Sequence, residues 1–208
     1  MKTARELPRT PLAMAVMNLL MEHPMHPYEM KLKIKERGHD QVIRLKGGSI
    51  YDTVVRLEEG GFIKSQETSR EGRRPERTVY AITDTGREEI KDWLRELLSE
   101  PVHEYPQFAA ALAFMAGLSK EDVVHLLQVR IVALEARIAA LDSQLKSLVT
   151  DMRLPRLFMI EGEYSLAMDR AELAWVRQTI QEIQEGQLWI THEQMKAFEQ
   201  GITRQSTD

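Results

Sequence analysis

The chain has 208 residues, of which 43% are hydrophobic and 29% are charged, a balance typical of a globular protein with one or two domains. The absence of cysteine excludes disulfides, thiolate metal ligands and cysteine nucleophiles, and fits a cytoplasmic protein. No signal peptide is predicted, and no apolar stretch approaches the ~20 residues that span a bilayer, so no membrane partner is expected.

The net charge of −4 does not favour nucleic-acid binding, but the charges are unevenly distributed. Between Lys31 and Arg77 the sequence has twelve Lys and Arg against eight Asp and Glu, so this stretch is basic within an acidic chain. Binding to phosphate depends on the face that contacts it rather than on the total charge. The stretch is therefore compatible with DNA binding, although an ordinary solvated face would have the same composition.

Three helices are predicted in the first third of the chain, each from apolar residues at helical spacing between residues that cap or stop a helix. Thr10 and Ser49 are the expected caps of the first and third helices. The buried stripe of the third helix would be Ile50, Val54 and Leu57. The predicted helices are Pro11–Glu22, Pro27–Arg37 and a third that follows Gly47-Gly48 and ends at Gly60-Gly61.

Two short strands are predicted next, at Phe62–Gln66 and Arg77–Ile82. The segment between them, Ser69–Glu76, is rich in arginine and has the turn-forming composition of a hairpin tip. A fourth helix, capped by Thr83 or Asp84, follows the second strand. Three helices followed by a two-stranded hairpin with a basic tip form the element order of a winged helix.

The second half of the chain has the most regular pattern in the sequence. Pro101 and Pro106 mark a candidate boundary, after which apolar residues recur at alternating steps of three and four. This heptad predicts a long helix with a coiled-coil-like seam. Pro155 ends it, and a second long helix is expected from Leu157 to about Gln184. The seam residues are Val124, Leu127, Ile131, Leu134, Ile138, Leu141, Leu145 and Leu148.

The predicted fold is mainly α with a small two-stranded β-wing. We expect a winged helix-turn-helix DNA-binding domain over residues 1–100 and a helical, coiled-coil-like dimerisation domain over residues 101–208. The long helices of the second domain would join two chains in a homodimer. Two-fold symmetry would then present two recognition helices to a pseudo-palindromic operator, about one helical turn apart.

A winged helix has two elements that suit DNA. The third helix is apolar on one side and polar on the other, so it can pack inward and still enter a major groove. Its N-terminus offers backbone N–H groups to a phosphate, and Lys46 just before it is a further phosphate candidate. The hairpin carries Arg70, Arg73 and Arg74 at its tip and Arg77 at its base, which can contact the DNA backbone or a minor groove.

Five short motifs lie between Leu12 and Trp93, and they are Pro24–Glu29, Gly48–Tyr51, Leu57–Ile63, Gly72–Pro75 and Val79–Glu88. Together with the apolar first helix, they resemble the PadR family of transcriptional regulators. This resemblance implies a homodimeric repressor that blocks a promoter and is relieved by a small molecule. Two positions depart from the family pattern, which usually has Gly at Pro27 and Pro at Asp52. Asp52 would weaken binding to phosphate or accept a hydrogen bond from cytosine.

The resemblance implies that Ser49, Tyr51 and Arg56 contact DNA from the third helix. Each has an alternative role, since Ser49 can be only a helix cap, Tyr51 part of the core and Arg56 a solvated charge. Tyr28 is more typical of a structural residue, although its hydroxyl can reach a phosphate. The complete predicted DNA-binding set is Tyr28, Lys46, Ser49, Tyr51, Arg56, Arg70, Arg73, Arg74 and Arg77.

Aromatic side chains outside the DNA-binding helices indicate a candidate ligand site. The family resemblance implies a cavity at the dimer interface that takes a flat aromatic compound such as a phenolic acid. The alternative is that these residues form an ordinary core and dimer interface. The candidate effector-binding residues are Trp93, Tyr105, Phe108 and Trp175.

Neither catalysis nor metal binding is expected, and no cofactor is predicted. His23 and His26 are spaced like metal ligands, but the neighbouring sequence does not complete a site. The sequence has no phosphate-binding glycine motif and no nucleophile elbow. The alternative to a DNA-binding regulator is a winged-helix module that binds protein and not DNA, and removal of the wing arginines distinguishes the two.

Overall fold

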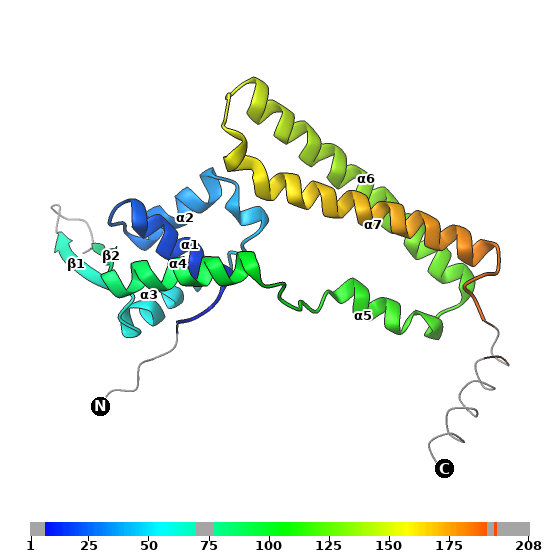
Figure 1. Cartoon of the computed structure of the whole chain (residues 1–208), viewed down its shortest axis with the longest axis horizontal. Helices are drawn as coiled ribbons and strands as arrows, with labels where there is room; N and C mark the ends of the chain where they lie inside the picture. Colours follow the sequence, from blue (N-terminus) through cyan, green and yellow to red (C-terminus); the bar gives the residue numbers. More distant parts are fainter. Residues whose placement is uncertain (1–6, 70–76, 191–193, 195–208) are drawn as a thin grey trace, which may run out of the picture. The chain divides into compact units, whose positions relative to one another are not determined.

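The computed structural model describes residues 7–69, 77–190 and 194, and the chain divides into two compact units (Figure 1). The first unit is Met1–Glu104 and the second is Tyr105–Asp208. Within the described residues, no helix has both the length and the apolar character needed to cross a membrane.

The first unit has the predicted element order of a winged helix. Both predicted threonine caps are present, because Thr10 Oγ1 accepts a hydrogen bond from the Ala13 N–H at 3.2 Å and Thr83 Oγ1 accepts one from the Gly86 N–H at 3.0 Å. The second helix ends one residue before Arg37, which is its C-cap. The elements are α1 (Pro11–Glu22), α2 (Pro27–Glu36), the 3₁₀ turn η1 (His39–Gln41), α3 (Ser49–Glu59), β1 (Ile63–Ser69), β2 (Arg77–Ile82) and α4 (Asp84–Ser99).

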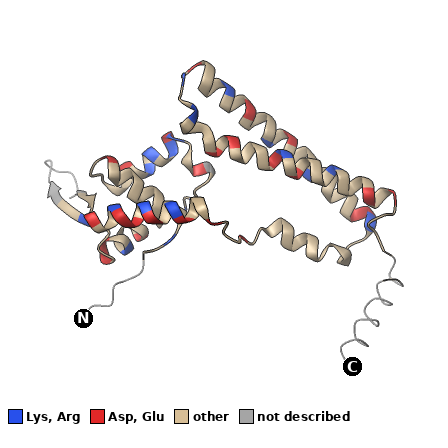
Figure 2. Ribbon diagram, in the orientation of Figure 1, with Lys and Arg blue, Asp and Glu red and all other residues tan. Residues whose placement is uncertain are grey.

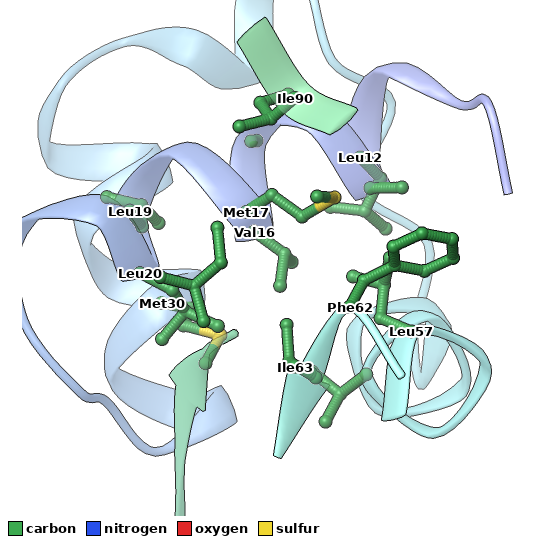
Figure 3. Close-up of a cluster of buried hydrophobic side chains, with 14 of the residues drawn as sticks. Leu12, Val16, Met17, Leu19, Leu20, Met30, Leu57, Phe62, Ile63 and Ile90 are labelled. Atoms are coloured by element: carbon green, nitrogen blue, oxygen red, sulfur yellow. The ribbon is translucent and has the colours of Figure 1, made fainter. Parts of the chain in front are cut away.

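The α1 helix lies at the centre of the core of this unit. Its Val16 and Met17 side chains are fully buried and lie among residues from three other elements (Figure 3). These neighbours are Leu57 of α3, Ile63 of β1 and Ile90 of α4. Burial of an aliphatic side chain of this size contributes about 1.5–3 kcal/mol, so the shared core fixes α3 against the rest of the unit.

The two strands form an antiparallel hairpin in which Ile63 lies opposite Ile82. The register shifts between Gln66 and Thr68, which places an additional residue on β1, as in a β-bulge. The prediction of Phe62–Gln66 for this strand was one residue early at its start and three residues short at its end. The added residues, Glu67, Thr68 and Ser69, are all polar, so the sequence has no apolar alternation there that would predict a strand.

Backbone contacts join the hairpin to its neighbouring helices. The N–H of Met25, in the α1–α2 turn, donates to the Tyr80 carbonyl, and the Tyr80 N–H donates to the Met25 carbonyl, each at 3.0 Å. At the start of α4, a Cβ atom on Gly86 would lie 2.0 Å from the Phe62 carbonyl oxygen. Only glycine allows this close approach between α4 and the start of the hairpin.

The second unit contains an antiparallel pair of long helices, α6 and α7, which lie side by side (Figure 1). All eight predicted seam residues of α6 are buried or half-buried. Val123 and Leu127 of α6 pack with Val176 and Ile183 of α7 in the core of this unit. The heptad stripe therefore packs within the chain, and a seam between subunits would need other residues. The elements are α5 (Gln107–Ala113), η2 (Met115–Gly117), α6 (Lys120–Thr150), η3 (Arg156–Met159) and α7 (Ile160–Gln184).

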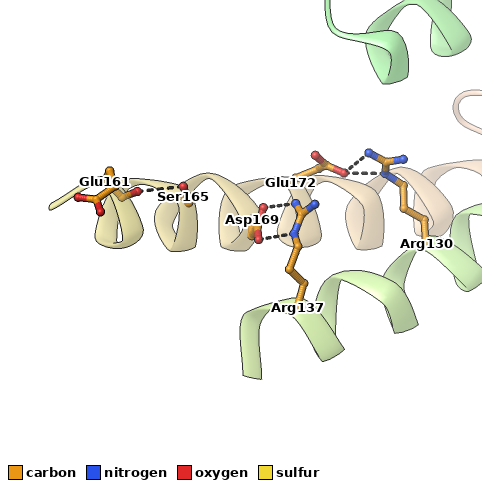
Figure 4. Close-up of polar contacts among 6 residues, drawn as sticks. All are labelled: Arg130, Arg137, Glu161, Ser165, Asp169 and Glu172. Atoms are coloured by element: carbon orange, nitrogen blue, oxygen red, sulfur yellow. Dashed lines mark hydrogen bonds and ion pairs between the residues drawn. The ribbon is translucent and has the colours of Figure 1, made fainter. Parts of the chain in front are cut away.

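Ion pairs between α6 and α7 fix the alignment of these helices (Figure 4). Arg137 binds Asp169 through two hydrogen bonds, one of them from Nε to Oδ2 at 2.6 Å. Asp169 is buried, and its hydrogen bonds raise the pKa of Arg137 above the ordinary value. Arg130 binds Glu172 at 2.6 Å, one helical turn further along α7. A shift of either helix would leave the buried Asp169 carboxylate unpaired, which is costly.

Candidate nucleic-acid interface and aromatic pocket

The α3 helix has one buried face and one exposed face. Ile50, Val54 and Leu57 are buried as predicted, and each is at most 3% exposed. The opposite face combines a phenol, an aliphatic group, a guanidinium and carboxylates, which is a set of groups able to bind several base edges. The exposed residues of α3 are Tyr51, Asp52, Val55, Arg56 and Glu59.

The start of α3 differs from the predicted cap. Gly48 is the residue before the helix and has a left-handed backbone with φ +77°, and no side chain caps the helix. The Ser49 hydroxyl instead donates to the Lys46 carbonyl at 2.7 Å. The interpretation of Ser49 as a helix cap is therefore wrong, because this serine is already the first helical residue. Lys46 itself is exposed at the start of the turn.

Tyr51 and Tyr28 both extend into solvent beside the α2 N-terminus. Tyr51 is 48% exposed and Tyr28 is 54% exposed, so neither belongs to the core. His26 joins them, since its Nδ1 accepts the Tyr28 backbone N–H at 3.1 Å and its ring meets the Tyr51 ring edge-on at 6.4 Å. The other predicted metal-spaced residue, His23, contacts Glu29 at 3.4 Å.

The wing residues are described only in part. Arg70, Arg73 and Arg74 lie outside the described residues. The backbone of Arg77 begins β2 opposite Ser69. Contact between these four arginines and DNA therefore stays a prediction.

Charges of both signs occupy the surface of the first unit (Figure 2). Lys31, Lys33 and Lys35 belong to α2, where Lys35 is exposed and the other two are half-buried. Acidic and basic residues both occur along α4 (Figure 2). Arg56 is exposed on α3, near the carboxylates of the same helix. A mixed surface of this kind favours contacts by particular cations rather than attraction by a uniformly basic patch.

The predicted effector residues separate into two groups. Phe108 of α5 and Trp175 of α7 meet edge-to-face, with ring centroids 6.2 Å apart. Trp93 is 4% exposed in the core of the first unit, and Tyr105 is 86% exposed and outside the pocket lining. The pocket is shallow, with a volume of about 240 Å³, and its lining is Pro106, Phe108, Ala109, Leu112, Glu172 and Trp175.

Three residues of these surfaces were absent from the sequence prediction. Val55 is half-exposed on α3, where its helical spacing of four from Tyr51 was the available signal. Glu172 and Arg130 lie beside the aromatic pair, because the Arg130 guanidinium carbon is 3.5 Å from the Phe108 ring centroid. Glu172 and Arg130 come close to the aromatic pair because α5 packs against α6 and α7. The spacing of residues within one helix does not predict such packing between helices.

Comparison with known proteins connects these features to one family. Residues 16–92 match the model of the transcriptional regulator PadR-like family. The negative transcriptional regulator PadR of Bacillus subtilis (strain 168) is 25% identical over 138 residues, which cover 66% of this chain and 75% of that protein. The matched family residues include α2, α3 and the hairpin, and therefore the whole exposed face of α3.

Solved structures share the fold over most of the chain. Bacillus subtilis PadR in complex with operator DNA has a TM-score of 0.66 at 22% identity, covering 83% of this chain and 98% of that one. The same regulator in complex with p-coumaric acid has a TM-score of 0.67 at 20% identity, with the same coverage. These similarities show a winged helix followed by a helical region. Through residues 16–92, the chain is similar to the PadR-like family of transcriptional regulators.

Proposed function

We propose that the chain regulates transcription by placing α3 in the major groove of DNA. The observation that carries this proposal is the two-sided α3 helix, whose buried face is held by the core while its other face is exposed. A short helix held in this way is the recognition element of helix-turn-helix proteins. The structure of the similar Bacillus subtilis PadR in complex with operator DNA supports DNA as the partner.

The exposed face of α3 suits bases of several kinds. Arg56 would donate to guanine, and the carboxylates of Asp52 and Glu59 would accept from cytosine. Val55 offers an apolar surface to a thymine methyl group. Tyr51 extends from the same face.

Contacts around this helix would set its position along the duplex. Lys46, Ser49 and Tyr28 lie at or near the N-terminal ends of α3 and α2, where phosphates are favourable partners. In this proposal, four arginines of the wing also contact phosphates. They are Arg70, Arg73, Arg74 and Arg77.

We also propose a homodimeric repressor that acts at a pseudo-palindromic operator. Because the heptad stripe packs within the chain, the second subunit would contact other apolar residues of the helical unit. Leu126, Val129 and Val132 of α6 are more than half exposed, and Tyr164 and Met168 of α7 are exposed at a spacing of four. Two such units joined by symmetry would present two α3 helices to one duplex.

A small aromatic effector is the proposed signal. The pocket beside Phe108 and Trp175 supports this role, because it is apolar except for one side chain and contains two aromatic rings. The effector would change the geometry of the dimer and release the operator. The complex of Bacillus subtilis PadR with p-coumaric acid supports a small aromatic compound as the effector.

The test is DNA binding by the whole chain, with the duplex selected by the protein from a random-sequence library. Fluorescence anisotropy would measure the affinity of the wild type, Arg56→Ala and Arg95→Ala. Arg56→Ala should weaken binding by about tenfold, because it removes a base contact. Arg95→Ala is the control on α4, where the side chain is 73% exposed.

An unchanged affinity of Arg56→Ala would contradict the role of α3. Failure of the wild type to enrich any sequence would favour the second function, a winged-helix module that binds protein and not DNA. Equal losses in both arginine variants would indicate a general effect of charge rather than a contact of α3.

A further inference from the structure

The aromatic pocket has one charged side chain among its described lining residues, Glu172. The other walls are apolar, and Phe108 and Trp175 present two rings at right angles. The pocket volume of about 240 Å³ exceeds the ~150 Å³ cavity that holds benzene, so it has space for one substituted ring. The charge that a ligand can carry therefore depends on the hydrogen-bonding capacity of the Glu172 carboxylate.

Glu172 has an oxygen available to a ligand. The Nε and Nη2 atoms of Arg130 both contact the same carboxylate oxygen, Oε1, at 2.6 Å. Figure 4 shows these two contacts meeting at one oxygen, while the second oxygen, Oε2, lies apart from them. A carboxylate accepts about four hydrogen bonds, so the pair with Arg130 leaves acceptor capacity at the pocket wall.

The positive charge of Arg130 is not available to a ligand as the Glu172 carboxylate is. Its guanidinium carbon lies 3.5 Å from the centroid of the Phe108 ring, and it is already paired with Glu172. Arg130 is also outside the set of residues that line the pocket. The charged group in the described lining is therefore a hydrogen-bond acceptor with negative charge, the carboxylate of Glu172.

We propose that the pocket binds a small aromatic compound that carries a protonated amine. The ring packs against Phe108 and Trp175, and the ammonium group donates to Oε2 of Glu172. A compound with a carboxylate at this place, such as a phenolic acid, would face the like charge of Glu172. This inference rests on the proposed effector function and names the chemical class of the effector.

The test is isothermal titration calorimetry of the full chain with three compounds on one scaffold. Tyramine carries an ammonium group, 3-(4-hydroxyphenyl)propionate carries a carboxylate and 4-ethylphenol is neutral. Tyramine should bind about tenfold more tightly than the propionate, a difference of about 1.4 kcal/mol, because only tyramine donates a charged hydrogen bond to Glu172. The Glu172→Gln variant should reduce this ratio to about one, while Glu121→Gln, an equal charge change outside the pocket, should keep it.

Three results would overturn the inference. These are tighter binding of the propionate to the wild type, a ratio unchanged by Glu172→Gln, and no heat of binding with any compound at millimolar concentration. Operator affinity measured on the same samples separates this inference from the proposed function. Intact DNA binding with no amine preference contradicts the pocket assignment alone, whereas absent DNA binding contradicts the proposed function.

Discussion

At the scale of single residues, the chemistry of α3 differs from position to position. Tyr51 and Val55 offer apolar surface, Arg56 offers donors, and Asp52 offers acceptors. Base pairs differ in these same properties along the major groove. The order of groups along the helix therefore limits which base sequences it can recognise.

Val55 gives the most specific prediction at this scale. Replacing the contacted thymine by deoxyuridine removes one methyl group and should weaken wild-type binding by about fourfold, the value of one buried methyl. Val55→Ala should bind the two duplexes with nearly equal affinity, because it loses both γ-methyl groups of the valine. Anisotropy titrations with the two duplexes measure both effects.

Val102→Ala is the matched control for this comparison, because Val102 is 62% exposed outside α3. It should retain the fourfold preference for thymine. A preference that survives in Val55→Ala would assign the methyl contact to another residue.

The sequence predicted the buried residues of α3 better than its surface contacts. Ile50, Val54 and Leu57 follow from helical periodicity, and all three are buried. Ser49 was misassigned as a cap because serine is common both before a helix and in its first turn. Val55 was missed because an exposed valine on a helix is ordinary by itself, and becomes informative only beside Tyr51 and Arg56.

At the scale of elements, an ion pair joins α1 to the end of α2. Arg37 donates to Glu22 through both terminal nitrogens, at 2.5 and 2.8 Å. These hydrogen bonds lower the pKa of Glu22 below its ordinary value of 4.5. Both side chains are more than one third exposed, so solvent screens the pair and its contribution to stability is small.

The Glu22→Gln variant should be slightly less stable than the wild type at pH 7, by a few tenths of a kcal/mol. Since the pKa of Glu22 is lower in the folded state, its contribution is complete above the unfolded pKa and disappears as the pH falls through the folded pKa. Thermal unfolding at pH 7 and at pH 3 should therefore show a smaller difference from wild type at pH 3. Glu88→Gln, exposed on α4, is the control, and a difference that grows at pH 3 would contradict the role of this pair.

Elements with strong local signals were predicted well, and those that depend on tertiary contacts were not. The helix Pro11–Glu22 is as predicted, because Thr10 and Pro11 mark its start. The heptad of α6 predicted a long helix, but the same stripe fits a partner from the same chain or from a second chain. The turn at Pro155 allows α7 to pack back onto α6. This packing places the apolar stripe of α6 against the same chain rather than against a second subunit.

At the scale of the whole molecule, the proposed control of a promoter uses both units of the chain. The first unit holds α3, and the second unit supplies exposed apolar helix surface and the aromatic pocket. A homodimer with two α3 helices requires two contacted half-sites on one face of the duplex. This requirement makes the pattern of groove contacts a test of both the helix and the dimer.

The most direct measurement is dimethyl sulfate footprinting of a duplex selected by the protein. Dimethyl sulfate methylates guanine N7, which lies in the major groove, and a helix bound there protects this atom. Two α3 helices in the major groove should protect two clusters of guanines about one helical turn, or ~10 base pairs, apart. Arg56→Ala should lose protection at the guanine that Arg56 contacts in each cluster. Unchanged methylation of a fully bound duplex, or a single protected cluster, would contradict the placement of two α3 helices in the major groove.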